Sequence, residues 1–483
     1  MMRFGLVVNR TGGILVAVAA FMVTPLPFSL YYRADDLWAI AVSASITAGV
    51  GALMFWLTPR TDEAGHREGI LIVVLAWILA AGFGALPFYL YGTFPTYTDC
   101  YFEAMSGFTT TGASVLVDIE KQPAGILFWR SLTHWIGGMG IVVLSLAVLP
   151  ALGAGGMQLY KAEVPGPTTD KLVPRIRETA KRLYVVYSVI SAALVLFLLA
   201  GGMPLFDSLT HMFGTMGTGG FSPKNASVGY YKSVYLEMVI AAFMYIAGAN
   251  FLLHYNLLAR RDVKGYLRDD EFRFYTGVIG FSVITATVNL LAAGVYPGFL
   301  EALRHSIFNV VSIITTTGFV TENFVRWPAY AHYLLLILMF IGGCAGSTGG
   351  AIKCVRILLL LRMGYGHVFK IIHPKAVRGI RFNGKVVSPE VLQGIQSMFV
   401  LYMATFVAAS LGLAWLGSDA LTAISAVAAT LGNVGPGLGA VGPVENYFNL
   451  SLTGKWICSF CMLAGRLEVY SVFVLLAPEF WHR

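Results

Sequence analysis

Charged residues are scarce in this chain. Asp, Glu, Lys and Arg make up 12% of its 483 residues, whereas soluble globular proteins usually contain about 25%. Hydrophobic residues reach 57%, and the mean hydropathy is +0.71. A soluble globule is therefore excluded, and the composition predicts a polytopic membrane protein.

Cysteine is sparse and gives no disulfide framework. The five cysteines are scattered, mostly inside apolar segments, at positions 100, 344, 354, 458 and 461. Cys458 and Cys461 have the spacing of a C-x-x-C pair, but no histidine or further cysteine accompanies them. We therefore expect them to pack inside a helix and not to bind a metal.

Catalytic motifs are missing as well. The sequence contains no H-E-x-x-H motif and no G-x-x-x-x-G-K-[ST] phosphate loop, and His134, His211, His254 and His305 lie in separate segments without a nucleophile motif. An intramembrane hydrolase is thus the third of three candidate functions, and no organic cofactor is expected. The second candidate is an ion-coupled secondary transporter with broken helices, but the near absence of acids from the apolar segments disfavours it. The first is a gated cation pore.

Ten apolar stretches are long enough to cross a bilayer, which takes about 17–25 residues. They lie at about 12–31, 37–58, 69–92, 125–151, 183–203, 233–258, 274–295, 329–361, 391–417 and 452–477. The first stretch is too long for the apolar part of a signal peptide and has no A-x-A cleavage site, so we expect it to be retained. The sequence predicts an all-α membrane protein.

Four shorter apolar runs lie between these stretches, at intervals of about a hundred residues. Each begins at an acidic residue and ends in a Thr/Gly-rich turn: Asp99 leads to TTTGAS at 109–114, Asp207 to GTGGFS at 217–222, Glu301 to TTTGFV at 315–320 and Asp419 to GNVGPG at 432–437. The runs are too short to cross a membrane but long enough to reach its middle. They predict re-entrant half-helices, with the acids as caps at their N-terminal ends and not as ion ligands.

Basic residues predict the orientation. The loops 59–68, 152–182, 259–273 and 354–388 hold 20 of the 33 Lys and Arg residues, so this side and both termini are expected to be cytoplasmic. The half-helices then enter from outside, and their C-terminal ends, each with about half a negative charge, favour a monovalent cation at the midplane. The net charge of +8 follows from this bias, and nucleic acid is not expected as a partner. The two longest basic loops are either docking surfaces for a soluble regulator or solvated loops.

The four turns align residue by residue. The aligned positions are Thr110, Thr218, Thr316 and Asn433, then Thr111, Gly219, Thr317 and Val434, and then Gly112, Gly220, Gly318 and Gly435. Four such turns around one axis would form a ring of backbone carbonyls that replaces the water shell of an ion, and glycine permits the positive φ that this path needs. The second and fourth turns lack the paired threonines of the first and third, so the ring is less uniform than four identical loops.

A glycine-rich stretch interrupts the eighth apolar segment. It contains Gly342, Gly343, Gly346, Ser347, Thr348, Gly349 and Gly350. Small residues at this density break a helix and permit a loop inside the membrane, which would plug a pore on the cytoplasmic side of the ring. The alternative is a small-residue surface at which helices approach closely.

Arg466 lies in the last apolar segment, and an ionisable residue there indicates a functional site. It would either repel cations and hold a closed state or bond the carbonyls of the glycine-rich loop; the alternative is a structural arginine at a helix end. Glu468 is a poor partner because it would face away from Arg466 on a helix.

Four other polar residues near the ends of the spans have simpler expected roles. Arg130 and His134 lie one helical turn apart near the outer end of the fourth span, where snorkelling to the interface explains them. Lys353 and Arg356 are expected to anchor the inner interface, with a part in gating as the alternative.

These motifs resemble the Trk/Ktr/HKT superfamily of potassium transporters. The resemblance rests on the four imperfect turns, on W-x-G-G-M-G at 135–140 and on G-G-x-x-G-S-T-G-G-x-I-K at 342–353, and it covers essentially the whole chain. It implies a pseudo-tetrameric pore formed by one polypeptide, a homodimer, and a cytosolic ring of TrkA-type subunits whose nucleotide binding controls the gate. It also implies K+ as the transported ion, with Rb+ and Na+ tolerated, and a gating role for Gly346, Ser347, Thr348, Gly349, Gly350, Lys353 and Arg466.

The expected organisation has five parts. Two N-terminal helices occupy 1–66, and four pore repeats follow at 67–165, 166–262, 263–375 and 376–483, of which the third contains the broken helix. The expected function is potassium and rubidium uptake across the bacterial inner membrane, through a gated, channel-like pore with a four-part carbonyl filter.

Overall fold

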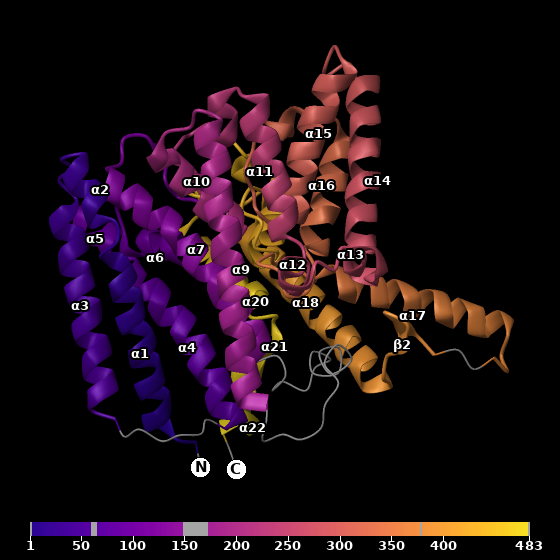
Figure 1. Ribbon diagram of the computed structural model, residues 1–483, viewed down its shortest axis with the longest axis horizontal. Coiled ribbons are helices and arrows are strands. Elements are labelled where there is room, and N and C mark those ends of the chain that lie inside the picture. The colour runs from indigo at the N-terminus through magenta and orange to yellow at the C-terminus, as the bar shows by residue number, and fades with distance from the viewer. Residues whose placement is uncertain (1, 59–64, 148–171, 377–378, 482–483) are drawn as a thin grey trace.

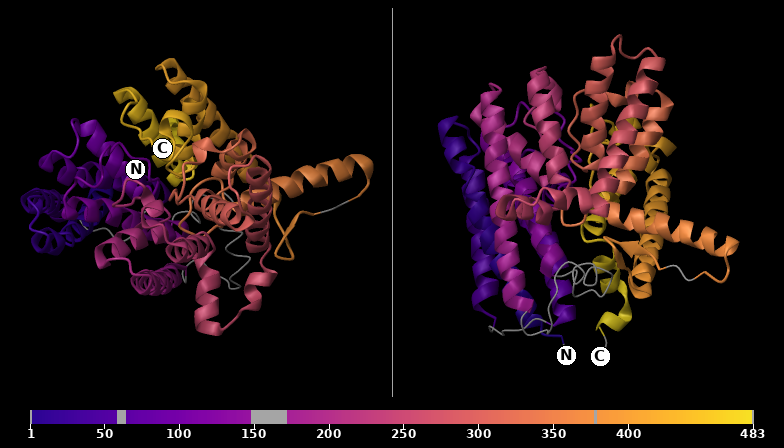
Figure 2. Two further views of the ribbon diagram at one scale, coloured as in Figure 1. Left: turned by 90° about the horizontal axis from the view of Figure 1, so that it is seen from above. Right: turned by 45° about the vertical axis from the view of Figure 1, so that its right-hand side comes forward.

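The computed structural model describes residues 2–58, 65–147, 172–376 and 379–481, and almost all of its regular structure is helical. Long helices run roughly parallel through the molecule, and both termini lie at the same end (Figure 1). Seen from above, the chain passes once around the molecule, from indigo through magenta and orange to yellow (Figure 2, left). Segments far apart in the sequence are thereby brought together at the centre.

The N-terminal helices form a pair on one edge. They are α1 (Phe4–Met22), with the short α2 (Leu26–Tyr31) after it, and α3 (Leu37–Trp56). Gly12 and Gly51 face each other where the two long helices cross, and a β-carbon on either would lie less than 3.0 Å from the backbone of the other helix. The pair is joined to the rest of the molecule by the Asp36 carboxylate, which accepts a hydrogen bond from the Ile126 N–H at 2.8 Å.

The remaining helices repeat one pattern four times: a long helix, a half-helix, a turn and a returning helix. We call these units quarters and number them in chain order. The first quarter contains α4 (His66–Gly84), α5 (Leu86–Tyr91), the half-helix α6 (Tyr97–Phe108) and α7 (Ala124–Ala147). The second contains α9 (Leu172–Ala200), the half-helix α10 (Leu205–Gly217), η3 (Ser227–Tyr231), α11 (Val234–Ala247), α12 (Phe251–Arg260) and α13 (Lys264–Arg268).

The third and fourth quarters follow the same order. The third contains α14 (Asp270–Ala292), the half-helix α15 (Phe299–Ile314), η4 (Phe324–Arg326), α16 (Ala329–Ile341), α17 (Cys354–Ile372) and a small hairpin of β1 (Arg381–Phe382) and β2 (Lys385–Val386). The fourth contains α18 (Pro389–Trp415), the half-helix α19 (Ala420–Leu431), η5 (Gly439–Val441), α20 (Leu452–Arg466), α21 (Tyr470–Leu476) and α22 (Pro478–Trp481). The four half-helices are confirmed as short helices at the expected places.

The ten expected crossings are only partly confirmed. Within the described ranges, six helical spans are long and apolar enough to cross a membrane, namely 4–31, 37–56, 67–91, 178–200, 270–292 and 389–415. Two other expected crossings are sharply bent: α11 and α12 meet at 97°, and α20 and α21 at 115°. The expected break within 329–361 is confirmed, because α16 ends at Ile341 and α17 begins only at Cys354. The second half of this segment does not continue the crossing, since α17 leaves the bundle sideways (Figure 1).

The region 354–388 is therefore not the extended loop that its charges predicted. Most of it is α17, whose exposed side chains include the apolar Leu361, Tyr365, Val368 and Ile372. The other long basic loop, 152–182, lies largely outside the described residues, which resume with α9 at Leu172.

The bend between α11 and α12 is stabilised by backbone groups of the glycine-rich stretch. Breaking a helix frees carbonyls, and these must find other donors. The Gly248 carbonyl accepts from the Cys344 N–H at 2.8 Å, and the N–H of Phe251 donates to the Gly346 carbonyl at 3.1 Å. Asn250 caps α12 by accepting from the Leu252 N–H. The bend and the glycine-rich stretch thus depend on each other.

All four acids lie at the N-terminal ends of the half-helices, but they do not all act as caps. Asp419 is the N-cap of α19 and accepts from the Thr422 N–H at 3.0 Å. At α6 the N-cap is Thr96, whose hydroxyl accepts from the Asp99 N–H and donates to the Asp99 carboxylate. Asp207 and Glu301 lie in the first turns of their helices, whose N-caps are a proline and a glycine. There the acids interact favourably with the helix dipole without capping the helix.

Buried ion pairs join neighbouring quarters. Lys455 of the fourth quarter lies 2.6 Å from Asp99 of the first, and both side chains are at most 5% exposed. Arg304 of the third quarter donates to Glu237 of the second at 2.6 Å. The first of these pairs closes the ring of quarters, because it links the last part of the chain to the first half-helix.

We expect Lys455→Met to destabilise the protein by roughly 3–5 kcal/mol, because it leaves the Asp99 carboxylate buried and unpaired. The midpoint of thermal unfolding in detergent should fall clearly. Lys121→Met is the matched control, since Lys121 also pairs with an aspartate but is 80% exposed; it should change the stability by about 0–1 kcal/mol. Equal midpoints for the two variants would contradict this account.

Candidate functional site

The turns after the four half-helices follow the same backbone path. The residues at the first aligned position have left-handed φ angles: 51° at Thr110, 53° at Thr218, 59° at Thr316 and 53° at Asn433. The glycines two residues later have φ angles of 80° at Gly112, 78° at Gly220, 80° at Gly318 and 98° at Gly435. Positive φ is uncommon for non-glycine residues, so its recurrence at four aligned positions indicates one shared turn geometry.

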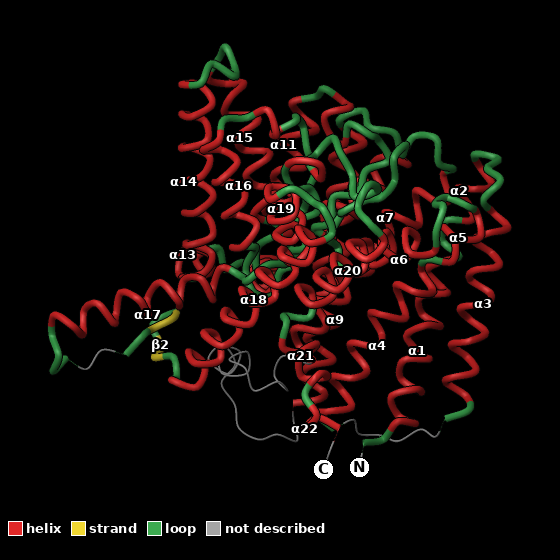
Figure 3. Tube along the Cα trace, turned by 180° about the vertical axis from the view of Figure 1, so that it is seen from behind, coloured by secondary structure: helices red, strands yellow, loops and turns green. Residues whose placement is uncertain are grey.

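The four glycines form a closed ring. A β-carbon placed on each glycine would lie less than 3.0 Å from a carbonyl oxygen of the next quarter: Gly219 O for Gly112, Thr317 O for Gly220, Val434 O for Gly318 and Thr111 O for Gly435. The last contact returns to the first quarter, so the turns surround one axis. The oxygens come from the position before each glycine, and the loop segments gather in the middle of the molecule (Figure 3).

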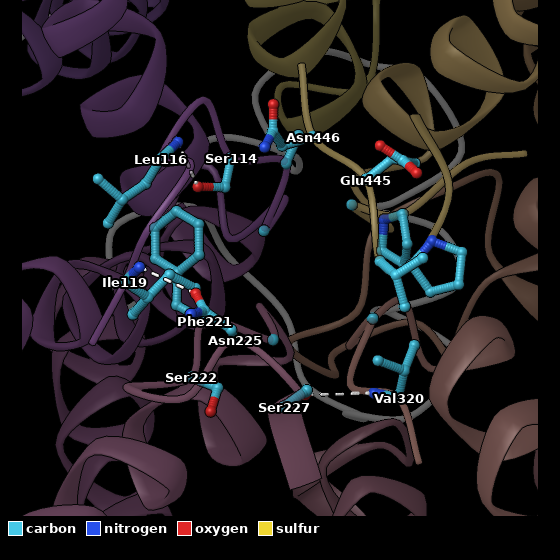
Figure 4. A pocket seen from close by; sticks show the side chains of 18 of the residues that line it. Ser114, Leu116, Ile119, Phe221, Ser222, Asn225, Ser227, Val320, Glu445 and Asn446 are labelled. Carbon is cyan, nitrogen blue, oxygen red and sulfur yellow. Dashed lines mark hydrogen bonds between the residues drawn. The ribbon is translucent and has the colours of Figure 1, made fainter. Parts of the chain in front are cut away.

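A vestibule of about 150 Å³ opens on one side of this ring, and all four glycines line it. Side chains from different quarters surround its opening, among them Ser114, Asn225, Val320 and Glu445 (Figure 4). The turns therefore border on space that is accessible to an ion arriving from this side.

Side chains behind the ring hold the turns in two different ways. In the first and third quarters, paired threonine hydroxyls lie 2.8 Å apart, Thr109 with Thr111 and Thr315 with Thr317. In the fourth, the Asn433 amide donates to Thr111 Oγ1 and to the Met462 carbonyl, both at 2.9 Å. In the fourth turn, the hydrogen bonds of Asn433 thus take the place of a threonine pair.

Three half-helices also bond the extended segments that follow their glycines. The residue that does so lies nine positions before the glycine: Glu103 bonds Ser114 Oγ at 2.9 Å, His211 bonds Ser222 Oγ at 3.1 Å, and Asn309 bonds Thr321 Oγ1 at 3.4 Å. This role was not predicted for any of the three. The fourth quarter has Ala426 at this position, and the Tyr447 hydroxyl donates instead to the Gly435 carbonyl at 2.8 Å. The sequence does contain a signal for these contacts: a polar residue occurs at the same aligned position in three otherwise apolar half-helices.

Arg130 is not a snorkelling residue, and that prediction was wrong. It is 2% exposed, and its guanidinium bonds Glu103 at 2.6 Å, the Ser222 carbonyl at 3.1 Å and Ser114 Oγ at 3.1 Å. Arg130 thus links the segment that follows Gly112 to the segment that follows Gly220. His134 is also completely buried, so snorkelling is wrong for it too.

The glycine-rich stretch lies on the other side of the ring from the vestibule. Its Gly350 N–H donates to Thr316 Oγ1 at 2.7 Å, directly beneath the third turn. Both ends of the stretch are fixed by one carboxylate, because Glu271 Oε1 accepts from the N–H groups of Ala345 at 2.7 Å and Val355 at 2.9 Å. Gly346, Ser347, Thr348 and Gly349 form the middle of this segment.

Arg466 contacts this segment directly. It is 2% exposed and donates to the Thr348 carbonyl at 2.8 Å and to the Gly137 carbonyl at 3.3 Å. Lys353 is also buried, and its ammonium donates to the Gly349 carbonyl within the same segment, so its expected role as an interface anchor is wrong. The chain then bends sharply after Arg466.

The bend between α20 and α21 has an unusual backbone. Glu468 and Val469 both have positive φ, 58° and 61°, and the Tyr470 N–H donates to the Glu468 carbonyl at 2.6 Å. Val469 combines this φ with a ψ of −51°, which is the geometry of a γ-turn and is rare and strained. Such backbone strain costs of order 1–3 kcal/mol and persists only when its surroundings fix it. The Glu468 carboxylate forms an ion pair with Arg356 at the start of α17. Ion pairing thus connects the bend to the helix that follows the glycine-rich segment.

Comparisons with known proteins agree with this arrangement. Residues 39–483 match a family model described as TrkH, a cation transport protein. The chain is 42% identical to the Trk system potassium uptake protein TrkH of Salmonella typhimurium, over 99% of this chain and 100% of that protein. It is 34% identical to the Trk system potassium uptake protein TrkG of Escherichia coli K12, over 98% of each.

A solved structure has the same fold. The crystal structure of the potassium transporter TrkH from Vibrio parahaemolyticus aligns over 100% of both chains with a TM-score of 0.92 and 37% sequence identity. Together with the family match over residues 39–483, this likeness means that the chain belongs to the TrkH family of cation transport proteins.

Proposed function

We propose that this chain takes up potassium, and rubidium, through a gated, channel-like pore whose selectivity filter is the ring of backbone carbonyls. The TrkH family consists of transporters and not of enzymes, and relatives over the whole length are named potassium uptake proteins. The single observation that carries the proposal is the closed cycle in which each of four glycines faces a carbonyl oxygen of the next quarter.

The ring suits a dehydrated alkali cation. Backbone carbonyls replace the ion's water shell, and the glycines, which lack a β-carbon, let neighbouring turns approach. We assign this role to three positions in each turn: Thr110, Thr111 and Gly112; Thr218, Gly219 and Gly220; Thr316, Thr317 and Gly318; and Asn433, Val434 and Gly435. Each turn has positive φ angles at its first and third aligned positions, so the carbonyls of the four turns have similar orientations.

The half-helices add an electrostatic contribution. All four end immediately before the ring, at Phe108, Gly217, Ile314 and Leu431. A helix C-terminus carries about half a negative charge, so four such ends favour a cation and disfavour an anion beneath the filter.

The glycine-rich segment is our candidate for the gate. It contains Gly346, Ser347, Thr348, Gly349, Gly350 and Lys353. Its Gly350 N–H donates to Thr316 of the third turn, and Arg466 donates to its Thr348 carbonyl. The buried guanidinium places a positive charge beside the ion's exit, and its hydrogen bonds favour the closed position of the segment.

The setting and partners of the protein are also proposals. Its several apolar spans make it a multi-pass membrane protein, and we place it in the bacterial inner membrane with both termini in the cytoplasm, because basic residues concentrate on that side. As a member of a Trk system it would work with other Trk components. We propose a homodimer and a cytosolic, TrkA-type nucleotide-binding subunit as those partners, on the basis of the superfamily resemblance.

The filter assignment is tested by Gly112→Ala, Gly220→Ala, Gly318→Ala and Gly435→Ala. Each β-carbon would collide with a carbonyl of the next quarter at a positive φ, and such strain costs roughly 1–3 kcal/mol. We expect Rb+ influx into proteoliposomes to fall by about tenfold or more and competition by K+ and Na+ to become more equal.

Gly92→Ala is the matched control for these variants. Gly92 has a φ of +82° as well, but no atom lies within 4 Å of a β-carbon placed there. This variant should keep both the influx and the ion preference. If the four filter variants behaved like it, the carbonyl ring would not be the filter.

The gate assignment is tested by Arg466→Ala. Removing the guanidinium deletes the hydrogen bond to Thr348 and a positive charge near the exit, so we expect Rb+ influx to rise about tenfold or more, as the loss of a charged hydrogen bond of roughly 1.5–3 kcal/mol implies. Arg362→Ala, which removes an ion pair to Asp270 outside this segment, should leave the influx unchanged. A large loss of influx in well-folded Arg466→Ala protein would oppose a closing role.

A further inference from the structure

The second turn of the ring lacks a side chain where the first and third have one. Thr111 and Thr317 occupy the position before the glycine, and their hydroxyls pair with Thr109 and Thr315 behind the filter. The second turn has Gly219 at this position. Without other support, the consecutive glycines 219 and 220 would leave this turn the most flexible of the four, because glycine adopts more backbone conformations than any other residue.

The imidazole of His134 occupies the space beside Gly219. A β-carbon on Gly219 would lie less than 3.0 Å from three ring atoms of His134: Nδ1, Cε1 and Cγ. His134 belongs to α7 of the first quarter, so it reaches the second turn from the neighbouring unit. The ring is completely buried, and its centre lies 4.1 Å from that of Phe221, the residue after Gly220.

The backbone of His134 is equally close to the end of the second half-helix. A β-carbon on Gly217 would lie less than 3.0 Å from the His134 carbonyl. Gly217 replaces the threonine that the first and third turns carry at 109 and 315. Both threonines of the pair are thus absent from the second turn, and one residue of α7 fills the places of both.

The contacts of His134 are packing contacts. Neither ring nitrogen has a hydrogen-bond partner among the described residues, so the imidazole contributes volume and shape at this place. Removing the imidazole would leave a cavity beside the second turn, and the atoms around it would lose many van der Waals contacts at once.

We propose that His134 is a positioning residue that determines ion specificity, because it fixes the second quarter of the filter in place of the missing threonine pair. It does not touch the ion. It holds the Gly219 peptide, whose carbonyl faces Gly112 in the ring, and so sets the width of the ring at the junction of the first and second quarters. This inference rests on the proposed filter.

The decisive comparison uses three variants: His134→Ala, Gly219→Thr, and the double variant. His134→Ala removes the support, and Gly219→Thr alone collides with the imidazole. In the double variant the imidazole no longer occupies this space, and the second turn carries a threonine at the position of Thr111 and Thr317. Gly219 does not have a positive φ, so the backbone accepts a side chain there.

The readout is Rb+ influx into proteoliposomes with K+ or Na+ as competitor. We expect each single variant to lower the K+ over Na+ preference by about threefold to tenfold, in line with the coupling energies of residues in direct contact. The double variant should recover at least half of the loss. A merely structural role would lower the amount of folded protein without this reciprocal recovery of ion preference.

Phe128→Ala is the control for a cavity in the same helix. Phe128 is buried in α7 but stacks on Phe28 of α2 at 4.3 Å. It should lower the thermal stability and keep the ion preference. Only variants that elute from size-exclusion chromatography like the unchanged protein are compared. If Gly219→Thr alone does not fold, the ion preferences of His134→Ala and the double variant can still be compared.

The outcomes separate this inference from the filter assignment. An unchanged ion preference in His134→Ala, with altered preference in Gly112→Ala and Gly318→Ala, would overturn the role of His134 and leave the filter standing. An unchanged preference in all of them would overturn the filter as well. A double variant no better than the poorer single variant would also contradict the proposal.

Discussion

The structure depends on the close approach of four glycines to four carbonyl oxygens. Each glycine lies where any side chain would collide with the backbone of the next quarter, so the cycle exists only because all four positions lack a β-carbon. The long helices, the half-helices and the buried ion pair between Lys455 and Asp99 all hold four unlike segments at this spacing. A single chain thereby builds an arrangement that symmetric channels obtain from four identical subunits.

Unlike sequences allow the quarters to be supported differently. Threonine pairs support the first and third turns, an asparagine bonds across to the first quarter from the fourth, and an imidazole packs against the second. Such differences cost little stability where each turn keeps its backbone path. The differences also allow each turn to contact different parts of the molecule. Arg130 of α7 bonds the segments after the first and second turns, and the glycine-rich segment bonds the third turn.

Much of the fold could be predicted from the sequence because length and hydropathy decide it locally. The half-helices and the aligned positions of their turns followed from spacing alone. The bends at 248–250 and 467–469 could not be predicted, because the first is stabilised by backbone groups about a hundred residues away and the second by contacts with α17. Arg130 was misread for the same reason, because its partner Glu103 belongs to another helix. Lys353 was misread because it lies in an irregular segment inside the molecule, where its ammonium bonds the Gly349 carbonyl of that same segment.

The last bend is made by two residues with positive φ, Glu468 and Val469. Before these two residues α20 ends at Arg466, and after them α21 is held by the Tyr470 hydroxyl, which donates to the Gly394 carbonyl of α18 at 3.0 Å. Rotation about the backbone bonds of these two residues would change the 115° angle between α20 and α21, so the orientation of the last two helices depends on them.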